Sequence, residues 1–280
     1  MEYLDRRRAL VEERLESALA EIDPPELADS INHVTFAGGK RVRPTVTILS
    51  CEALGGEARD AVDFAAGVEL VHTASLVVDD IIDESTIRRG VESAHEKYGV
   101  GAAIIASDGL LGQAFELFSA GPQAMRIVAE AMVDLGQGEA VELVDRPTNE
   151  DEYRLLARRK TGALFRTAAE LGVLAADGTD DQIDAMGEYA ERVGVAFQMR
   201  DDVLDATAES HVIGKPTGTD AAMDRPSLLE VTDLTVEEVN ERAHAEAQAA
   251  LDALARVPLV DQAAADYLEE LAIFVVERNR

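Results

Sequence analysis

The residues of this chain most able to do chemistry are two acid clusters with the same spacing. Asp79 and Asp83 follow an apolar run, and Asp201 and Asp205 follow a second one. In a helix each pair lies one turn apart on one face, where two carboxylates repel each other unless solvent or a cation separates them. Mg²⁺ accepts carboxylate oxygens and shares phosphate oxygens with a substrate. The pattern is typical of a Mg²⁺ site for a phosphate ester, with a solvated acidic face as the alternative.

A third copy of the spacing warns against relying on the acids alone. Asp180, Asp181 and Asp184 follow Gly178-Thr179 at a predicted helix start. Acids in that position complement the helix dipole and cap free amides. We therefore interpret this third cluster as a helix cap. The other two clusters differ from it because each follows a long apolar stretch and has cations nearby.

The cations form groups suited to phosphate. Arg88 and Arg89 follow the first acid cluster, and guanidinium forks match phosphate oxygens. Lys40 and Arg43 come after Gly38-Gly39, where the backbone can approach an anion closely. Taken alone, the second group is more typical of a solvated turn. His72, two turns before Asp79, is by itself more typical of a core histidine. Lys160 lies in an otherwise apolar helix, and Lys215 and Arg225 lie in a predicted loop.

The elements that position these residues are predicted to be helices. Apolar residues recur at i, i+3 and i+4, and no segment alternates as a strand would, so we expect no sheet. The predicted helices cover residues 3–20, 26–36, 45–54, 59–85, 92–118, 123–145, 150–176, 182–206, 235–256 and 260–277. Residues 208–226 are rich in Gly, Pro and Thr and are predicted to form a long loop over the site.

Composition limits the class of protein. The chain has 280 residues with 26 Lys and Arg against 55 Asp and Glu, a net charge of −29. That charge disfavours nucleic acid and anionic lipid as partners and is typical of proteins from a high-salt cytoplasm, so we expect a halophilic archaeal source. The single Cys51 excludes an internal disulfide, and no signal sequence or uninterrupted membrane-spanning run is visible. We expect one cytoplasmic domain over residues 1–280 without stable membrane insertion.

Five motifs in this order resemble the polyprenyl synthetase family, the trans-isoprenyl diphosphate synthases. They are GGKRVRP at 38–44, HTASLVVDDIIDESTIRRG at 72–90, KTGALF at 160–165, FQMRDDVLD at 197–205 and GKPTGTD at 214–220. The resemblance implies an all-α antiparallel helical bundle around a central cavity, usually as a homodimer. It also implies a Mg²⁺-dependent reaction. An allylic diphosphate ionises, the double bond of isopentenyl diphosphate attacks the allylic cation, and loss of a proton leaves a longer trans-prenyl diphosphate.

The resemblance assigns roles by position. The implied catalytic residues are Asp79, Asp83, Arg88, Lys160, Asp201 and Lys215. The implied metal ligands are Asp79, Asp83, Asp201 and Asp205. The allylic substrate would be held by Arg88, Lys160, Thr161, Gln198 and Lys215, with Arg225 as a further cation. Isopentenyl diphosphate would be held by Lys40, Arg43, His72 and Arg89. Thr161 and Gln198 are also expected to steady the cation through their oxygens.

The sequence departs from the family's motifs at two places, and its residues before the first acid cluster predict the length of the product. Asp224-Arg225-Pro226 replaces the family's glycine-lysine pair, and Gly138-Glu139 stands for its usual acidic helix. In this family bulky residues just before the first acid cluster stop the growing tail early. Ala74 and Ser75 occupy those positions, so we predict geranylgeranyl diphosphate or a longer product. The alternatives are a longer-chain synthase for a quinone side chain and a non-catalytic subunit of such a synthase.

Overall fold

The computed structural model describes residues 2–211 and 226–278, which are helical apart from one short hairpin. The first half contains α1 (Glu2–Leu19), α2 (Pro25–Thr35), α3 (Val42–Ala53), α4 (Ala58–Ile82), α5 (Ala94–Tyr98) and α6 (Val100–Phe118). The middle contains α7 (Pro122–Val144), α8 (Glu150–Ala157), the π-helical segment η1 (Arg158–Gly162) and α9 (Ala163–Ala175). The last part contains α10 (Asp180–His211), α12 (Leu228–Val231), α13 (Val236–Leu254) and α14 (Gln262–Glu277).

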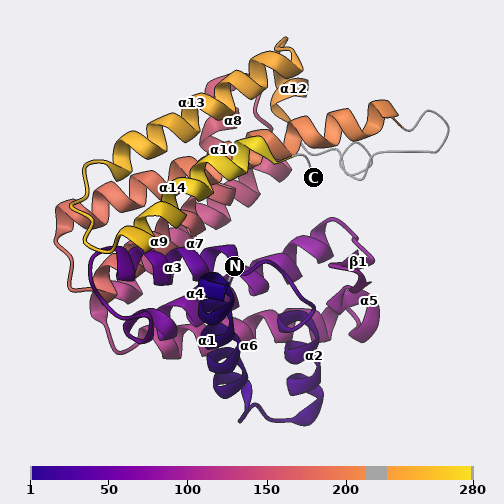
Figure 1. The fold of residues 1–280 in the computed structure, drawn as a ribbon. Helices are drawn as coiled ribbons and strands as arrows, with labels where there is room; N and C mark the ends of the chain where they lie inside the picture. The colour runs from indigo at the N-terminus through magenta and orange to yellow at the C-terminus, as the bar shows by residue number, and fades with distance from the viewer. Residues whose placement is uncertain (1, 212–225, 279–280) are drawn as a thin grey trace.

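The helices pack as a bundle, which confirms the predicted all-α fold. Figure 1 shows α1 to α6 on one side and α10 to α14 on the other, with α7 and α9 between them. Helix α4 packs against α3, α6 and α9, and α10 packs against α9 and α13. One continuous apolar cluster extends from Val11 in α1 to Val276 in α14. The single domain over residues 1–280 stays a prediction, and this shared core supports it.

Helix α4 carries the first acid cluster out of the core. It begins at a capping box between Glu57 and Asp60 and ends with Asp83 as its C-cap. The N–H of Asp83 donates to the carbonyl of Asp79 over 2.8 Å. The two acids therefore lie one turn apart, as the helical period requires.

A two-stranded hairpin follows α4, so the prediction of no sheet was wrong here. Strand β1 (Ile87–Arg88) pairs antiparallel with β2 (Val91–Glu92), with Ile87 opposite Glu92. Arg89 and Gly90 form the turn with φ of 53° and 83°, the left-handed conformation that such tight hairpins need. Strands of two residues are too short to show alternation in the sequence. The hairpin directs the arginine pair back toward the end of α4.

Two predicted helices are interrupted. The segment predicted as one helix over 92–118 breaks at Gly99, whose φ of 86° separates α5 from α6. The segment predicted as one helix over 150–176 contains η1, which holds Lys160 and Thr161. A π-turn inserts an extra residue into a helix and occurs frequently at functional sites. Helix α10 crosses close by, since a Cβ on Gly194 would lie 2.9 Å from Gly162 Cα.

Two helices, α4 and α6, are long and apolar enough to cross a membrane. The search for uninterrupted apolar runs overlooked them because acidic residues interrupt both. In α4 61% of the most apolar stretch is buried inside the protein, which its position in the core explains. In α6 only 33% is buried. Its exposed face carries the apolar side chains Val100, Ile104, Ile105 and Phe115.

Candidate active site

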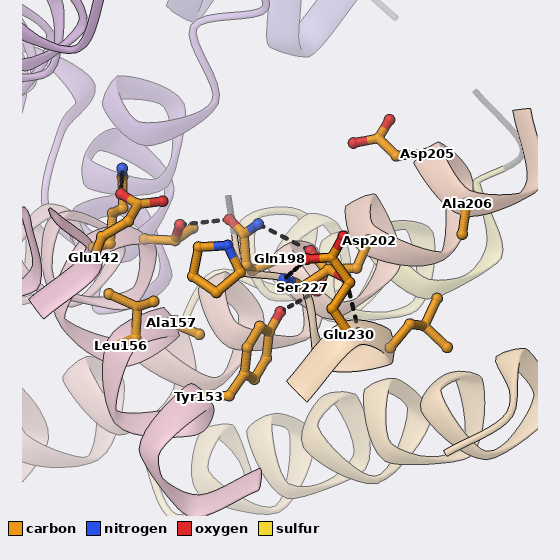
Figure 2. Close-up of a pocket in the computed structure, with 14 residues that line it drawn as sticks. Glu142, Tyr153, Leu156, Ala157, Gln198, Asp202, Asp205, Ala206, Ser227 and Glu230 are labelled. Atoms are coloured by element: carbon orange, nitrogen blue, oxygen red, sulfur yellow. Dashed lines mark hydrogen bonds and ion pairs between the residues drawn. The ribbon is translucent and has the colours of Figure 1, made fainter. Parts of the chain in front are cut away.

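A pocket of about 240 Å³ opens between α7, α8, η1, α10 and the start of α12. Four residues singled out from the sequence line it, namely Lys160, Thr161, Gln198 and Asp205. Figure 2 shows the side chains that surround it, with Tyr153 and Leu156 on one side and Asp202 and Asp205 on the other. The structure therefore brings the lysine motif of η1 and the second acid cluster of α10 to one cavity.

Lys160 is surrounded by carboxylates. Its Nζ contacts Oε1 of Glu139 at 3.1 Å and also pairs with Glu142 on the same helix. Burial alone would lower the pKa of Lys160, but Glu142, Glu139 and Asp79 together raise it. Burial and the Asp79 carboxylate raise the pKa of Glu139 to about 7, against the lowering influence of Lys160. Asp79 on α4 is thus in electrostatic range of the pocket's lysine.

A hydrogen-bonded chain crosses the floor of this pocket. Thr161 Oγ1 donates to Gln198 Oε1 over 2.9 Å, and Gln198 Nε2 donates to Asp202 Oδ1 over 3.3 Å. Asp202 also accepts from Tyr153 Oη over 2.7 Å (Figure 2). It accepts from the Leu228 N–H over the same distance. Burial raises the pKa of Asp202 to about 6 despite these donors. The chain fixes the rotamer of Gln198 and directs the Thr161 and Gln198 oxygens toward one another.

A second group of cations gathers around α3, α4 and the hairpin. Arg43 Nη1 lies 3.1 Å from His72 Nε2, and Arg89 Nη1 donates to the carbonyl of Gly38 over 2.5 Å. Burial lowers the pKa of Arg43 to about 10, and burial with the Arg43 and Arg89 charges lowers the pKa of His72 well below its usual range. Arg43 Nε is buried without a hydrogen-bond partner among the described residues. Cations this close are unfavourable together, so an anion would stabilise the group.

The remaining predicted cations have different surroundings. Arg88 Nε donates to Asp80 Oδ1 over 2.8 Å, so Asp80 orients the first arginine of the pair. Lys40 is exposed beside this group. Arg41, between Lys40 and Arg43, is buried and pairs with Glu12 and Glu69, which makes it a structural residue. Lys215 and Arg225 lie outside the described residues.

Two of the four predicted metal ligands, Asp79 and Asp83, lie at the end of α4, and the other two, Asp201 and Asp205, lie in the last third of α10. Asp205 lines the pocket, while Asp79, Asp83 and Asp201 are not among its lining residues. Within residues 2–211 and 226–278 no three acidic, histidine or cysteine side chains lie close enough to hold an ion by themselves. Carboxylate pairs of this kind suit a hard divalent ion that keeps waters and takes its other ligands from a phosphate.

The third acid cluster is a helix start, as interpreted from the sequence. Thr179 N–H donates to Gln182 Oε1 over 2.8 Å, and the Gln182 N–H donates back to Thr179 Oγ1 over 3.4 Å. Asp180 and Asp181 occupy the first turn of α10.

Sequence reasoning missed three residues near the site. Glu142 pairs with Lys160, and its only signal was its position one turn after Glu139 on α7. Tyr153 holds Asp202 across 49 positions of sequence. Arg278 pairs with Asp201 across 77 positions. No local pattern could have found the last two.

Comparisons with known proteins agree with this geometry. The family model described as polyprenyl synthetase matches residues 24–265. A geranylgeranyl diphosphate synthase of Methanosarcina mazei is 31% identical, covering 100% of this chain and 90% of the relative. A geranylfarnesyl diphosphate synthase of Aeropyrum pernix is 35% identical over 92% of this chain and 87% of its own length. The crystal structure of a decaprenyl diphosphate synthase from Rhodobacter capsulatus superposes with a TM-score of 0.90 at 29% identity, covering 100% of this chain and 98% of the other. The chain therefore belongs to the polyprenyl synthetase family.

Proposed function

We propose that this protein is a trans-prenyltransferase that condenses isopentenyl diphosphate with an allylic diphosphate, chiefly to give geranylgeranyl diphosphate. The observation that carries the proposal is the presence of two separate groups of residues that could each take a diphosphate. One is the pocket that joins Lys160 to the acid Asp205, where divalent ions would offset the carboxylates, and the other is the pair of cations Arg43 and Arg89 beside His72. A condensation of two diphosphates requires two such sites, whereas hydrolysis of one diphosphate would need only one.

The family uses divalent metal ions, and Mg²⁺ is our proposal for this chain. The ligands would be Asp79, Asp83, Asp201 and Asp205, with substrate oxygens and water completing each site. When bound, Mg²⁺ supplies positive charge that offsets the charge developing on the departing diphosphate. The carboxylates are already placed one turn apart on two helices, which supports this assignment.

The allylic diphosphate is assigned to the Lys160 pocket. Its phosphate oxygens would be bound by Lys160 and Arg88, with Lys215 and Arg225 remaining sequence predictions. Asp80 holds Arg88 in place, and Glu139 and Glu142 hold Lys160. These partners keep the cations ordered before substrate arrives, so little side-chain entropy is lost on binding. Lys160 stabilises the leaving diphosphate as the C–O bond breaks.

The allylic cation needs polar support and protection from water. The oxygens of Thr161 and Gln198 face the pocket and are fixed by the chain that ends at Tyr153. They are proposed to steady the cation without attacking it. Leu156 and Ala157 give the same pocket an apolar wall that keeps water from the reacting carbon.

Isopentenyl diphosphate is assigned to the second cation group. Arg43 and Arg89 would bind its phosphates, joined by His72 and the exposed Lys40. Because Arg43 Nε is buried without a hydrogen-bond partner among the described residues, a diphosphate would satisfy a donor that is otherwise unpaired. Burial and the arginine charges lower the pKa of His72, and the diphosphate would offset those charges.

The product length is proposed from the residues before the first acid cluster. Ala74 and Ser75 are small, so they do not close the space below Asp79 as an aromatic side chain would. Similar proteins are named for geranylgeranyl and geranylfarnesyl products, which supports a chain longer than farnesyl. A longer-chain synthase for a quinone side chain remains the second candidate, because the decaprenyl synthase has the same fold.

The test is elongation of labelled isopentenyl diphosphate with each of several allylic primers and Mg²⁺, followed by product chromatography. A geranylgeranyl product supports the proposal. Products that stop at farnesyl overturn the length, and products beyond the geranylfarnesyl length favour the quinone-chain enzyme. Absence of elongation with every primer would favour a non-catalytic subunit.

A homodimer and a cytoplasmic location are proposed with the activity. The apolar stripe of α6 leaves Ile104 and Ile105 about half exposed, which a second copy would cover. Light scattering should give twice the chain mass, and Ile105→Asp should shift it to the monomer. Cys51 is buried and unpaired, and burial raises the pKa of its thiol to about 12, which fits a reducing compartment.

A further inference from the structure

Arg278, the residue that caps α14, lies against the second acid cluster. Its guanidinium stacks on Phe197, with 3.8 Å between Cζ and the ring centroid. Its Nη2 donates to the Phe197 carbonyl over 3.2 Å and also pairs with Oδ1 of Asp201. One arginine from the end of the chain's last helix therefore spans one turn of α10, from Phe197 to Asp201.

Contacts other than the one with Asp201 hold Arg278 in place. Its carbonyl accepts from Arg200 Nε over 3.0 Å and from Arg200 Nη2 over 2.7 Å. Arg200 Nη1 in turn donates to Asn240 Oδ1 on α13 over 2.7 Å. The guanidinium itself is held by the ring and the carbonyl of Phe197, so it would stay in position if Asp201 took up a cation. Arg200 holds only the main chain of Arg278.

The stack under Arg278 continues into the interior. The ring of Phe197 contacts the ring of Phe165, with 6.3 Å between their centroids. Arg43 lies over the Phe165 ring, with 4.6 Å from its Cζ to the ring centroid. Each guanidinium thus rests on an aromatic face, a favourable cation–π arrangement. The two aromatic rings therefore support both Arg278 and a cation of the isopentenyl diphosphate site.

The side chains of Arg278 and Asp201 differ in their exposure to solvent. The side chain of Arg278 is 8% exposed and that of Asp201 is 38% exposed. A divalent ion from solution could therefore reach the aspartate far more easily than a substrate could reach the arginine. Carboxylates that bind metals are themselves commonly held by hydrogen bonds from a second layer of residues, and loss of such a partner typically weakens metal binding.

We propose that Arg278 is a positioning residue that orients the Asp201 carboxylate for the divalent ion, an inference that rests on the proposed function. It binds neither substrate. It fixes the direction of the Asp201 carboxylate on α10 and reduces repulsion between Asp201 and the neighbouring acids before the ion binds. The end of α14 is thereby part of the site although its sequence lies far from both acid clusters.

The experiment measures metal binding without turnover. Mn²⁺ is titrated by electron paramagnetic resonance into the enzyme with inorganic pyrophosphate, for the parent and for Arg278→Gln, Arg278→Lys and Arg200→Gln. Arg200→Gln is the matched control, because it loosens the same helix end without contacting Asp201. We expect Arg278→Gln to weaken Mn²⁺ binding by about tenfold. Arg278→Lys should give an intermediate loss, and Arg200→Gln should stay within about twofold of the parent while its melting temperature falls.

The outcomes separate this inference from the proposed function. If Arg278→Gln binds Mn²⁺ as well as the parent, or if Arg200→Gln weakens binding equally, Arg278 is only a clamp between helices and the inference is wrong. If Arg278→Gln does not fold, Arg278→Lys decides, and unchanged binding there also overturns the inference. Prenyl elongation by the parent is measured separately. If the parent does not elongate prenyl chains, the proposed function is wrong. If the parent elongates them and Arg278→Gln binds Mn²⁺ as the parent does, only this inference is wrong.

Discussion

His72 Nε2 faces Arg43 Nη1 across 3.1 Å, so the imidazole must be neutral and accepting in the ligand-free protein. Burial and the surrounding arginines lower the pKa of His72 well below its usual range. A bound diphosphate would add negative charge and favour the protonated ring. We therefore expect binding of a diphosphate at this group to be accompanied by uptake of a proton.

The first prediction concerns His72→Gln. Loss of one hydrogen bond to a charged substrate, worth about 1.5 kcal/mol, should raise KM for isopentenyl diphosphate about tenfold with little change in kcat. The pKa of His72 is low without ligand and rises with it, so affinity should increase as pH falls from about 8 to about 6. Steady-state kinetics across this range measures both effects.

His72→Gln also serves as the control that separates titration of His72 from titration of the substrate. The substrate's own phosphate titrates equally in both proteins, so only the difference between their profiles reports on His72. His244→Gln, at an exposed histidine on α13 whose Nδ1 lies 2.8 Å from the Asn240 carbonyl of the same helix, should behave as the parent. Identical profiles for parent and His72→Gln would contradict the prediction.

The second prediction concerns Lys160→Ala. Lys160 is held by Glu139 and Glu142 at the pocket assigned to the leaving diphosphate. Its loss should lower kcat/KM for the allylic substrate by about 100-fold, because a positioned charge on the leaving group is removed. KM for isopentenyl diphosphate should change by less than about threefold, since that substrate is assigned to other residues. Steady-state kinetics with each substrate varied in turn measures the effect on kcat/KM for the allylic substrate separately from the effect on KM for isopentenyl diphosphate.

Lys97→Ala is the matched control for Lys160. Lys97 contacts His33 and Tyr98 on the far side of α4 from this pocket, so its loss removes the same charge without touching the site. Equal losses for both substrates in Lys160→Ala, or a comparable loss in Lys97→Ala, would count against the assignment.

The third prediction concerns the depth of the product cavity. Ala74→Phe should shift the products toward shorter chains by adding bulk below the first acid cluster. Ala74 is 1% exposed and its carbonyl accepts from Ser107 Oγ over 3.2 Å, so the larger side chain also risks strain. Ser75→Phe is the second variant, because Ser75 is half-buried and its hydroxyl bonds only within its own helix, to His72 O.

Product chromatography of the parent and both variants tests the cavity floor. Val260→Phe adds the same ring at a position that is 73% exposed, just before α14, and should leave the product distribution unchanged. An unaltered chain length in both Ala74→Phe and Ser75→Phe would rule out these positions as the determinant.

The helical period was enough to predict the acid clusters, because it is a local property. Asp79 and Asp83 share a face because they are four residues apart in a helix, and the Asp83 N–H donates to the Asp79 carbonyl. The cap at Thr179 also involves residues only three positions apart. The hairpin at Ile87–Arg88 was missed because two residues cannot show a pattern. The π-turn around Lys160 was missed because composition does not distinguish it from the α-helix on either side.

Long-range partners limit what any sequence pattern can predict. Asp202 was visible as the middle member of an acid cluster, but Tyr153 and the Leu228 N–H that satisfy it come from separate elements. The distinction between Arg41, which is buried in ion pairs, and its neighbours Lys40 and Arg43 also depends on tertiary packing. Three cations in one short motif therefore have three different environments.

The fourth prediction concerns salt. A net charge of −29 makes the acidic side chains of the folded chain repel one another. The range of that repulsion is about 10 Å in 0.1 M salt but only about 3 Å in 1 M salt. The melting temperature should fall as KCl is reduced from about 3 M to about 0.1 M. Thermal unfolding followed by circular dichroism measures it. A melting temperature that is unchanged or higher in low salt would exclude the halophilic interpretation of the composition.

The fifth prediction concerns Glu170, which is buried in α9 beneath α10. A Cβ on Gly187 would lie 2.7 Å from Glu170 Oε1, so only a glycine lets α10 pass this close. Burial raises the pKa of Glu170 to about 7, although Arg166, 2.7 Å from its Oε1, lowers it. The folded protein therefore holds this proton more tightly than the unfolded chain does. The resulting stabilisation is complete below pH 4.5 and is lost as pH rises through about 7.

Glu170→Gln should reverse that loss, because the amide stays neutral. At pH about 4 its free energy of unfolding should be close to that of the parent, whereas at pH about 8.5 the variant should be relatively more stable by on the order of 3 kcal/mol. Denaturant unfolding at both pH values in constant KCl measures the difference. Glu270→Gln, which removes the same charge from an exposed position on α14, should show no such change with pH. If the advantage of Glu170→Gln does not grow with pH, the ion pair with Arg166 outweighs burial and the carboxyl is charged in the folded protein.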